Sequence, residues 1–260
     1  MHPQWLDLPA RSGKPRTAGL TMVIDNGLPT GLFADAVASS AAHIDIVKFG
    51  WGTCMVTADL DRKIGVLADH GIRFCFGGTL FEKFVIQGRF DGFLEFCRHW
   101  RCDLVEVSNG TIPLSNPDKA DYIRRCASEF FVTSEVGFKD QARAEEMSSA
   151  QWVDCIAEDL AAGAGLVITE ARESGRSGMC RPDGRLRAGL VETILAGGTD
   201  ADRLLFEAPT KDLQAQFVTL LGPNVNLGNV SLGDVIALET LRLGLRGDTL
   251  LHFEAASLYA

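Results

Sequence analysis

Short apolar runs alternate with amphipathic segments along the chain. The runs are rich in Val, Ile and Phe, and each ends at a glycine or a polar residue. Runs of this kind are typical of strands that are buried on both faces of a parallel sheet. We expect strands over Gly19–Asp25, Ile44–Gly50, Ile72–Gly77, Cys102–Ser108, Phe130–Gly137, Gly165–Glu170, Arg203–Ala208 and Val225–Gly228.

The segments between these runs carry spaced apolar residues among good helix formers, which predicts helices. We expect them over Leu60–His70, Glu82–Trp100, Pro117–Glu129, Ser148–Ala161 and Lys211–Leu221. Residues that cap helices stand where several helices would begin. These are Ser115 or Asn116, Ser148 or Ser149, Thr210 and Ser231.

The eight predicted strands are each followed by a helix, within about 250 residues. This count and length predict an α/β fold of the (β/α)8 TIM barrel type. We expect one barrel domain over residues 1–260, with residues 1–14 as an N-terminal extension. The alternative is a doubly wound open sheet, which would carry a GxGxxG turn after its first strand. The first strand ends instead in Asp25-Asn26-Gly27.

Composition narrows the class of protein. Hydrophobic residues make up 46% of the chain, too many for a disordered protein. Its apolar runs fall far short of the ~20 residues of a membrane span, and residues 1–14 do not resemble a secretory signal. A net charge of −9 argues against binding to nucleic acid or to an anionic membrane. Seven cysteines without a CxxC pair favour a reduced, cytoplasmic location.

Four glutamates stand at the ends of successive predicted strands. They are Glu106, Glu135, Glu170 and Glu207, about one strand–helix unit apart. In a barrel they would meet at the same mouth, where chemistry gathers. Converging carboxylates repel unless they share a proton or a cation, and oxygen ligands favour Mg²⁺ or Mn²⁺. The alternative is that each glutamate pairs with a neighbouring Lys or Arg.

Cations also gather at these strand ends, which is notable in an acidic chain. They are Lys48, Lys139, Lys211, Arg172 and Arg176. Lysine and arginine placed together suit a small, multiply charged anion such as a phosphate, sulfonate or carboxylate. The alternative is a set of surface salt bridges.

The Gly222–Ser231 segment is a second candidate for anion binding. It lies at the predicted eighth strand and leads toward a capped helix, where barrels commonly bind phosphate. Its polar or small residues are Asn226, Gly228 and Asn229.

Together these residues lie in blocks that resemble the phosphosulfolactate synthase family. The resemblance extends from about residue 14 to residue 250. Its blocks are KPRTAGLTMVIDNG (14–27), VKFGWGT (47–53), GGTLFE (77–82), VEVSNGTI (105–112), SEVGFKD (134–140), ITEARESG (168–175), LFEAPTK (205–211), GPNVNLGNV (222–230) and LETLRLGLRGDTL (238–250).

The resemblance implies a TIM barrel that catalyses a Mg²⁺-dependent carbon–sulfur bond formation, as a lyase. In that reaction sulfite adds to phosphoenolpyruvate and gives (2R)-O-phospho-3-sulfolactate, a step of coenzyme M biosynthesis. It also implies a homo-oligomer, with a trimer as the suggested number.

Roles follow from the resemblance position by position. It places Glu135, Glu170 and Glu207 at the metal, with Glu106 and Asp25 as further candidates. Lys139 is the candidate proton donor, Lys48 the second, and Glu106 completes the catalytic set. The residues for phosphate or sulfite are Arg172, Arg176, Lys211, Asn226, Gly228 and Asn229.

Two positions depart from the family pattern. Phe138 stands where the pattern has a lysine, and Asn109 where it has an aspartate. The lost cation leaves open an enzyme that adds a different nucleophile to an enol phosphate. A third hypothesis is an inactive barrel that only binds a ligand. The four glutamates argue against it.

Overall fold

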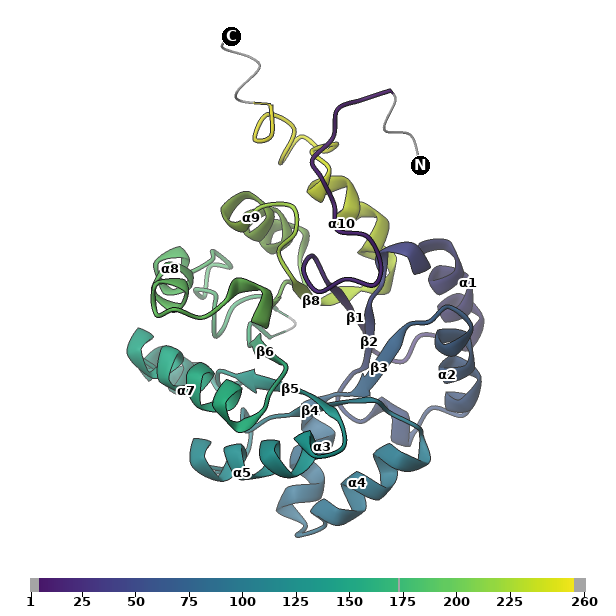
Figure 1. The fold of residues 1–260 in the computed structure, drawn as a ribbon, viewed down its shortest axis with the longest axis vertical. Coiled ribbons are helices and arrows are strands. Elements are labelled where there is room, and N and C mark those ends of the chain that lie inside the picture. The colour runs from purple at the N-terminus through teal and green to yellow at the C-terminus, as the bar shows by residue number, and fades with distance from the viewer. Residues whose placement is uncertain (1–4, 173, 255–260) are drawn as a thin grey trace.

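A computed structural model describes residues 5–172 and 174–254. Its strands form one parallel eight-stranded sheet in the order β3-β2-β1-β8-β7-β6-β5-β4 (Figure 1). The strands at the two ends of this order, β3 and β4, contact each other and nearly close the barrel. The strands are β1 (Thr21–Asp25), β2 (Ile46–Phe49), β3 (Arg73–Phe76), β4 (Leu104–Val107), β5 (Phe131–Val136), β6 (Leu166–Thr169), β7 (Leu204–Glu207) and β8 (Leu227–Ser231).

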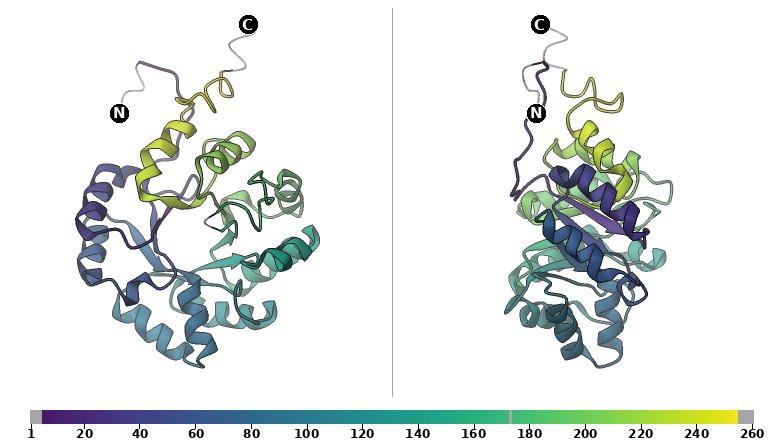
Figure 2. Two further views of the ribbon diagram at one scale, coloured as in Figure 1. Left: turned by 180° about the vertical axis from the view of Figure 1, so that it is seen from behind. Right: turned by 90° about the vertical axis from the view of Figure 1, so that its right-hand side faces the viewer.

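Helices surround the strands on the outside, as the view from behind shows (Figure 2). The α-helices are α1 (Thr30–Ser40), α2 (Leu60–Asp69), α3 (Gly78–Ile86), α4 (Phe90–His99), α5 (Asn116–Ala127), α6 (Gln141–Glu146), α7 (Ser149–Ala162), α8 (Ala188–Ala196), α9 (Lys211–Leu221) and α10 (Val235–Arg242). Short 3-10 helices are η1 (Ala41–His43), η2 (Thr53–Met55), η3 (Ala201–Arg203) and η4 (Leu232–Asp234). The predicted single-domain (β/α)8 barrel is confirmed, and the open sheet is not formed.

Three predicted caps are present. The side chains of Ser115, Ser148 and Thr210 accept backbone N–H bonds at the starts of α5, α7 and α9. Ser148 and Gln151 form a complete capping box. Ser231 precedes η4 without a side-chain cap.

Two predicted elements were placed wrongly. The expected helix Glu82–Trp100 is two helices, α3 and α4, because Gly88 takes a left-handed conformation with φ of +66° between them. The eighth strand ends at Ser231 rather than at Gly228. Gly228 and Asn229 are residue types that often end a strand, yet both lie inside β8.

The period-2 alternation of strand side chains explains why the barrel interior changes character along its axis. Its lower part is an apolar cluster that includes Ile46, Leu104, Ile168 and Leu205. One step of two residues toward the carboxyl end replaces each of these by a charged side chain. The replacements are Lys48, Glu106, Glu170 and Glu207. The barrel therefore rests on an apolar layer and carries a charged layer above it.

Behind β5, Lys119 of α5 holds the strand in place. Its Nζ atom lies 2.7 Å from Asp159 of α7 and donates to the backbone oxygen of Glu135 at 3.0 Å. Both side chains are fully buried, and Ser134 donates a hydrogen bond to the same aspartate. This ion pair therefore joins two helices to the strand that carries Glu135.

Lys119→Met is expected to lower the free energy of unfolding by about 3–5 kcal/mol, because it leaves a buried carboxylate unpaired. The double variant Lys119→Met/Asp159→Asn should recover most of this loss, since a neutral amide still accepts the Ser134 hydroxyl. Urea denaturation measures both. A single variant as stable as the wild type would contradict this account.

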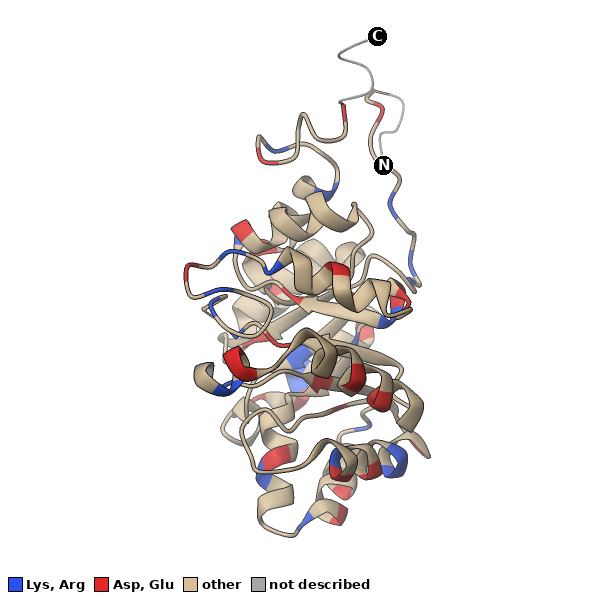
Figure 3. Cartoon of the chain, turned by 90° about the vertical axis from the view of Figure 1, so that its left-hand side faces the viewer, with Lys and Arg blue, Asp and Glu red and all other residues tan. Residues whose placement is uncertain are grey.

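Charged residues of both signs lie on the surface. Acidic and basic segments are interspersed over the face shown in Figure 3. Among the described residues, no helix combines the length and apolar character that crossing a membrane requires. All seven cysteines are free thiols, six of them buried.

Candidate active site

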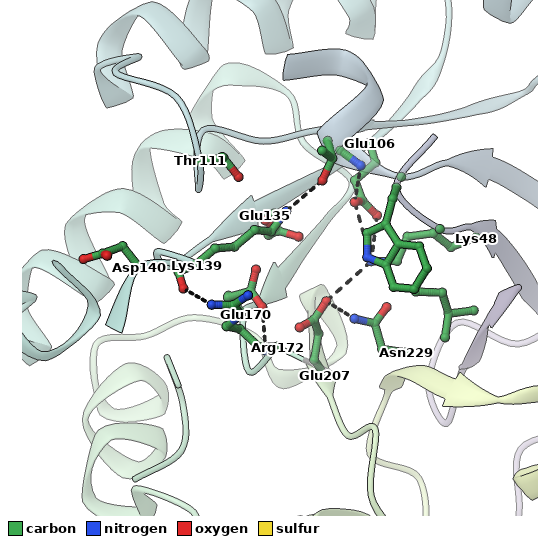
Figure 4. A pocket seen from close by; sticks show the side chains of 16 residues that line it. Lys48, Glu106, Thr111, Glu135, Lys139, Asp140, Glu170, Arg172, Glu207 and Asn229 are labelled. Atoms are coloured by element: carbon green, nitrogen blue, oxygen red, sulfur yellow. Dashed lines mark hydrogen bonds and ion pairs between the residues drawn. The ribbon is translucent and has the colours of Figure 1, made fainter. Parts of the chain in front are cut away.

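A cavity of about 390 Å³ opens at the carboxyl ends of the strands, and we call it the mouth cavity. The charged layer of the barrel lines it, together with the loops above (Figure 4). Its lining residues are Ile24, Lys48, Gly50, Trp51, Gly77, Gly78, Thr79, Glu106, Thr111, Glu135, Lys139, Asp140, Glu170, Arg172, Glu207 and Asn229. Most of the candidate residues from the sequence therefore meet here.

Lys48 lies at the base of the mouth cavity, on β2. Its Nζ atom is 3.2 Å from Glu106 and 3.4 Å from Glu207, so it bridges opposite sides of the barrel. Burial by itself lowers the pKa of this amine, but Glu106 and Glu207 outweigh burial and raise the pKa above its ordinary value. Lys48 is therefore a permanent positive charge inside the barrel.

Glu106 accepts a hydrogen bond from the backbone N–H of Gly78 at 2.6 Å, at the start of α3. The positive end of that helix favours an anion there. Burial nevertheless raises the pKa of Glu106, which the Lys48 charge only partly offsets.

Glu135 has the opposite balance, because cations surround it. Its Oε1 atom lies 3.4 Å from Lys139 Nζ and 2.9 Å from the Ser108 hydroxyl. Burial raises its pKa, but the positive charges of Lys139 and then Lys48 outweigh burial and lower the pKa to about 2. Glu135 is therefore a stable carboxylate that holds the Lys139 side chain over the cavity.

Lys139 is the more accessible of the two lysines. A quarter of its side chain is exposed, against 5% for Lys48. Its Nζ atom contacts Thr79 at 3.2 Å as well as Glu135. Burial lowers the pKa of Lys139, while Glu135 and Glu170 raise it to a net value above the ordinary one. The amine is thus protonated and can reach a molecule in the cavity.

Glu170 follows β6, and its negative charge is the least balanced by neighbouring cations. One oxygen accepts the backbone N–H of Arg172 at 2.5 Å, while the Oε2 atom is buried and has no hydrogen-bond partner in the part of the chain that the structure describes. Burial, followed by repulsion from Glu207 and Glu135, raises the pKa of Glu170 well above its ordinary value. The folded protein therefore favours a protonated or cation-bound Glu170.

This raised pKa has a consequence for stability. A carboxyl group whose pKa is raised by folding costs free energy once the pH exceeds its unfolded pKa, and costs nothing below it. Each unit of the rise corresponds to about 1.4 kcal/mol. We therefore expect Glu170→Gln to be more stable than the wild type at pH 8, with the difference vanishing near pH ~4.

Urea denaturation without Mg²⁺ or substrates, at both pH values, tests this expectation. Glu129→Gln is a matched control, because Glu129 is exposed and its ion pair with Arg98 lowers its pKa. That control should gain no stability at pH 8. A Glu170→Gln variant less stable than the wild type at pH 8 would exclude the proposed repulsion.

Glu207 and its neighbours complete the ring. The Asn229 amide and the backbone N–H of Ala171 both donate to Glu207, the second at 2.9 Å. Arg172 has a left-handed backbone with φ of +56°, and its guanidinium donates to the backbone oxygen of Lys139 at 2.7 Å. The loops that follow β5 and β6 are thereby tied together at the rim.

Several residues here were missed by the sequence analysis as site residues. Ser108 joins two carboxylates, because its hydroxyl lies 2.9 Å from both Glu82 and Glu135. Thr79 and Trp51 also line the cavity. A signal was available for Ser108, which directly follows β4. A signal was available for Glu82 too, which stands just beyond the third predicted strand, in the first turns of α3, and reaches back to Ser108.

Other candidates lie elsewhere. Lys211 is exposed and pairs with Asp248 at 2.8 Å. Asn226 lies toward the opposite end of the barrel, where it donates to the backbone oxygens of Asp202 and Leu204. Gly228 packs on Leu205 inside the barrel. Arg176 lines a separate cavity.

Asp25 and Phe138 also make their contacts with other residues, outside the charged ring. Asp25 pairs with the fully buried Lys63 at 2.5 Å. Phe138 lines a cavity beside α5 and α6, and the Arg143 guanidinium lies 4.0 Å from the centre of its ring. Asn109 donates to the backbone oxygen of Leu114.

The carboxylates suit a divalent cation that takes only one or two of its ligands from the protein. Within the described ranges of the chain, Glu170 offers a buried oxygen without a hydrogen-bond partner, and glutamates outnumber lysines in the lining of the cavity. Across residues 5–172 and 174–254, no three His, Cys, Asp or Glu side chains are grouped so as to hold an ion. Mg²⁺ commonly binds through one or two carboxylates, with substrate oxygens and water completing its shell. The residues fit that arrangement and not a cage made by the protein alone.

Comparison with known proteins gives consistent matches. The family model described as (2R)-phospho-3-sulfolactate synthase (ComA) matches residues 9–248. A phosphosulfolactate synthase of Bacillus subtilis is 51% identical over 244 residues, which cover 94% of this chain and 97% of that protein. One of Methanocaldococcus jannaschii is 40% identical over 238 residues, covering 89% and 93%.

A solved structure supports the fold alone. The 3-hexulose-6-phosphate synthase of Salmonella typhimurium superposes with a TM-score of 0.55 at 15% identity. The match covers 87% of this chain and all of that one.

Proposed function

This chain belongs to the (2R)-phospho-3-sulfolactate synthase family, and on that premise we propose that it adds sulfite to C3 of phosphoenolpyruvate. The observation that carries the proposal is the mouth cavity, where Lys139 and Lys48 stand among buried glutamates. The product would be (2R)-O-phospho-3-sulfolactate, and the cofactor Mg²⁺.

Two anions must first be brought together, which costs electrostatic free energy in water. Lys48, Lys139 and Arg172 supply positive charge to the mouth cavity. An enclosed site of low dielectric strengthens these attractions and holds the reactants in contact. We assign Arg172 and Lys139 to the substrate oxygens, since both reach the rim.

The bond changes balance without an oxidant. The sulfur lone pair of sulfite forms the C–S bond at C3, and the electrons of the C2–C3 double bond move toward C2 and the carboxylate. The carbon–oxygen bond to phosphate stays intact. A bound Mg²⁺ supplies charge stabilisation for the carboxylate on which negative charge develops. Glu170 would hold it, with Glu207 as the neighbouring oxygen donor.

A proton must then reach C2 from one face. Lys139 is the group we assign to this step, because its amine is protonated and accessible from the cavity. Glu135 holds the amine in place by an ion pair at 3.4 Å. Lys48 is too deeply enclosed between Glu106 and Glu207 for this role, and we assign it to charge balance.

A direct assay tests the function. Purified protein is incubated with phosphoenolpyruvate, sulfite and Mg²⁺, and phosphosulfolactate is followed by mass spectrometry. Product that disappears with a chelator and returns with Mg²⁺ would support the proposal. Absence of product while phosphoenolpyruvate still binds would refute the sulfite reaction.

The position of Phe138 bears on the choice of nucleophile. Because this ring lines another cavity and stacks with Arg143, its departure from the family pattern removes no charge from the mouth cavity. Phe138→Lys is therefore expected to leave kcat and the KM for sulfite within about twofold of the wild type. Steady-state kinetics at varied sulfite measures both constants. A large gain with sulfite would show that the ring does replace a needed cation.

A further inference from the structure

The loop between β6 and α8 contains a second cavity, of about 250 Å³, which we call the loop cavity. Among the described residues, none lines both this cavity and the mouth cavity. Figure 3 looks onto this side of the barrel, where α7 and α8 lie. The two cavities are therefore separate places on one molecule.

Three arginines line the loop cavity: Arg176, Arg181 and Arg187. Glu145 is the one acidic side chain among its described lining residues. Arg187 donates to the backbone oxygen of Gly178 at 3.1 Å. Within the described parts of the chain, the guanidinium groups of Arg176 and Arg181 have neither an ion pair nor a hydrogen bond.

A buried hydroxyl in the same lining gives a second, independent observation. Ser177 is 5% exposed, and its Oγ atom has no hydrogen-bond partner among the described residues. An unpaired buried hydroxyl costs free energy unless a partner arrives. Ser177 and the three arginines line the same cavity, and hydroxyl and guanidinium donors together are the donor set of an oxyanion site.

We propose that the loop cavity binds a small dianion, as free phosphate or as the phosphoryl or sulfonate group of a small molecule. Among the described lining residues, three guanidinium groups stand against one carboxylate, an excess of positive charge that favours an anion. Ligand pockets for drug-sized molecules span about 300–1,000 Å³, so this smaller space suits a small ligand. Arginine forks match the oxygens of such tetrahedral groups.

The loop cavity is mechanically joined to the active site. The backbone oxygen of Glu170 accepts the N–H of Met179 at 2.9 Å. A Cβ atom at Gly178 would lie 1.9 Å from that same oxygen, so the two backbones touch. An anion held by Arg176 and Arg181 thus binds the segment that positions Glu170. This site goes beyond the proposed function and does not depend on it.

The experiment is a calorimetric titration of the full-length protein with inorganic phosphate, without substrates. The test variant is Arg176→Gln/Arg181→Gln, and the matched control is Arg185→Gln. Arg185 is exposed in the same loop, where it lies 3.8 Å from Asp183, and it does not line the cavity. Charge-assisted hydrogen bonds contribute about tenfold each to binding.

We expect the wild type and the control to bind one more phosphate per chain than the double variant, whose affinity at this site falls at least tenfold. Tighter binding of glycerol phosphate than of phosphate would identify an esterified ligand, and the reverse a free anion. Equal phosphate binding in all three proteins would overturn the proposal. A crystal soaked in selenate gives a second test, because absence of an anomalous peak among the three arginines would also overturn it. Neither measurement requires turnover, so failure of the sulfite reaction would leave both tests intact.

Discussion

Lys139→Met should lower kcat by about 10²–10⁴-fold, the range that a positioned general acid contributes. Methionine keeps most of the length of the side chain and removes both the charge and the proton. The folded state should persist, because a quarter of Lys139 is exposed and Lys48 still compensates Glu135. Steady-state kinetics measures the loss, and urea denaturation checks that the variant is folded.

A second variant separates the role of Lys139 as a positive charge from its role as a proton donor. Lys139→Arg keeps the positive charge beside Glu135, but a guanidinium does not readily give up a proton. Its KM for phosphoenolpyruvate should therefore stay near that of the wild type, while kcat remains as low as in the methionine variant. An arginine variant with nearly full kcat would contradict the acid role and leave Lys139 as a charge alone.

The fold was predictable because its signals are local and repeated. Each buried strand shows as an apolar run, and the caps at Ser115, Ser148 and Thr210 mark where helices start. The break between α3 and α4 was missed because one left-handed glycine, Gly88, interrupts an otherwise continuous helical pattern. The shifted eighth strand was missed because Asn229 and Gly228 look like turn residues.

The charged ring was predictable for a related reason. Barrel strands bring equivalent positions to the same height, so the spacing of the glutamates places them around one mouth. Sequence could not show how each charge is paired. Lys211 has the residue type and position of a site residue, yet Asp248 draws it to the surface. The loop cavity was equally hidden, because Arg176 was assigned to the mouth on the basis of its strand alone.

Lys48→Met is expected to be the most destabilising single change in the ring. It removes the amine that bridges Glu106 and Glu207, and breaking a buried pair in this way costs about 3–5 kcal/mol. Turnover should fall with stability, since the charge that gathers the two anions is weakened. Urea denaturation gives the change in the free energy of unfolding, and the exposed Lys83→Met on α3 is the matched control, expected to change it by less than ~0.5 kcal/mol.

The pH dependence of this variant distinguishes a lost charge from a lost packing contact. Without Lys48, burial and repulsion from Glu135 raise the pKa of Glu106 in the folded state further above its unfolded value. Such a group costs stability as the pH rises through that interval and costs nothing when both states are protonated. The deficit of Lys48→Met should therefore grow between pH ~4 and pH 8. A deficit that is the same at both pH values would mean that the side chain acts by filling space, and that the carboxylates are balanced by another cation.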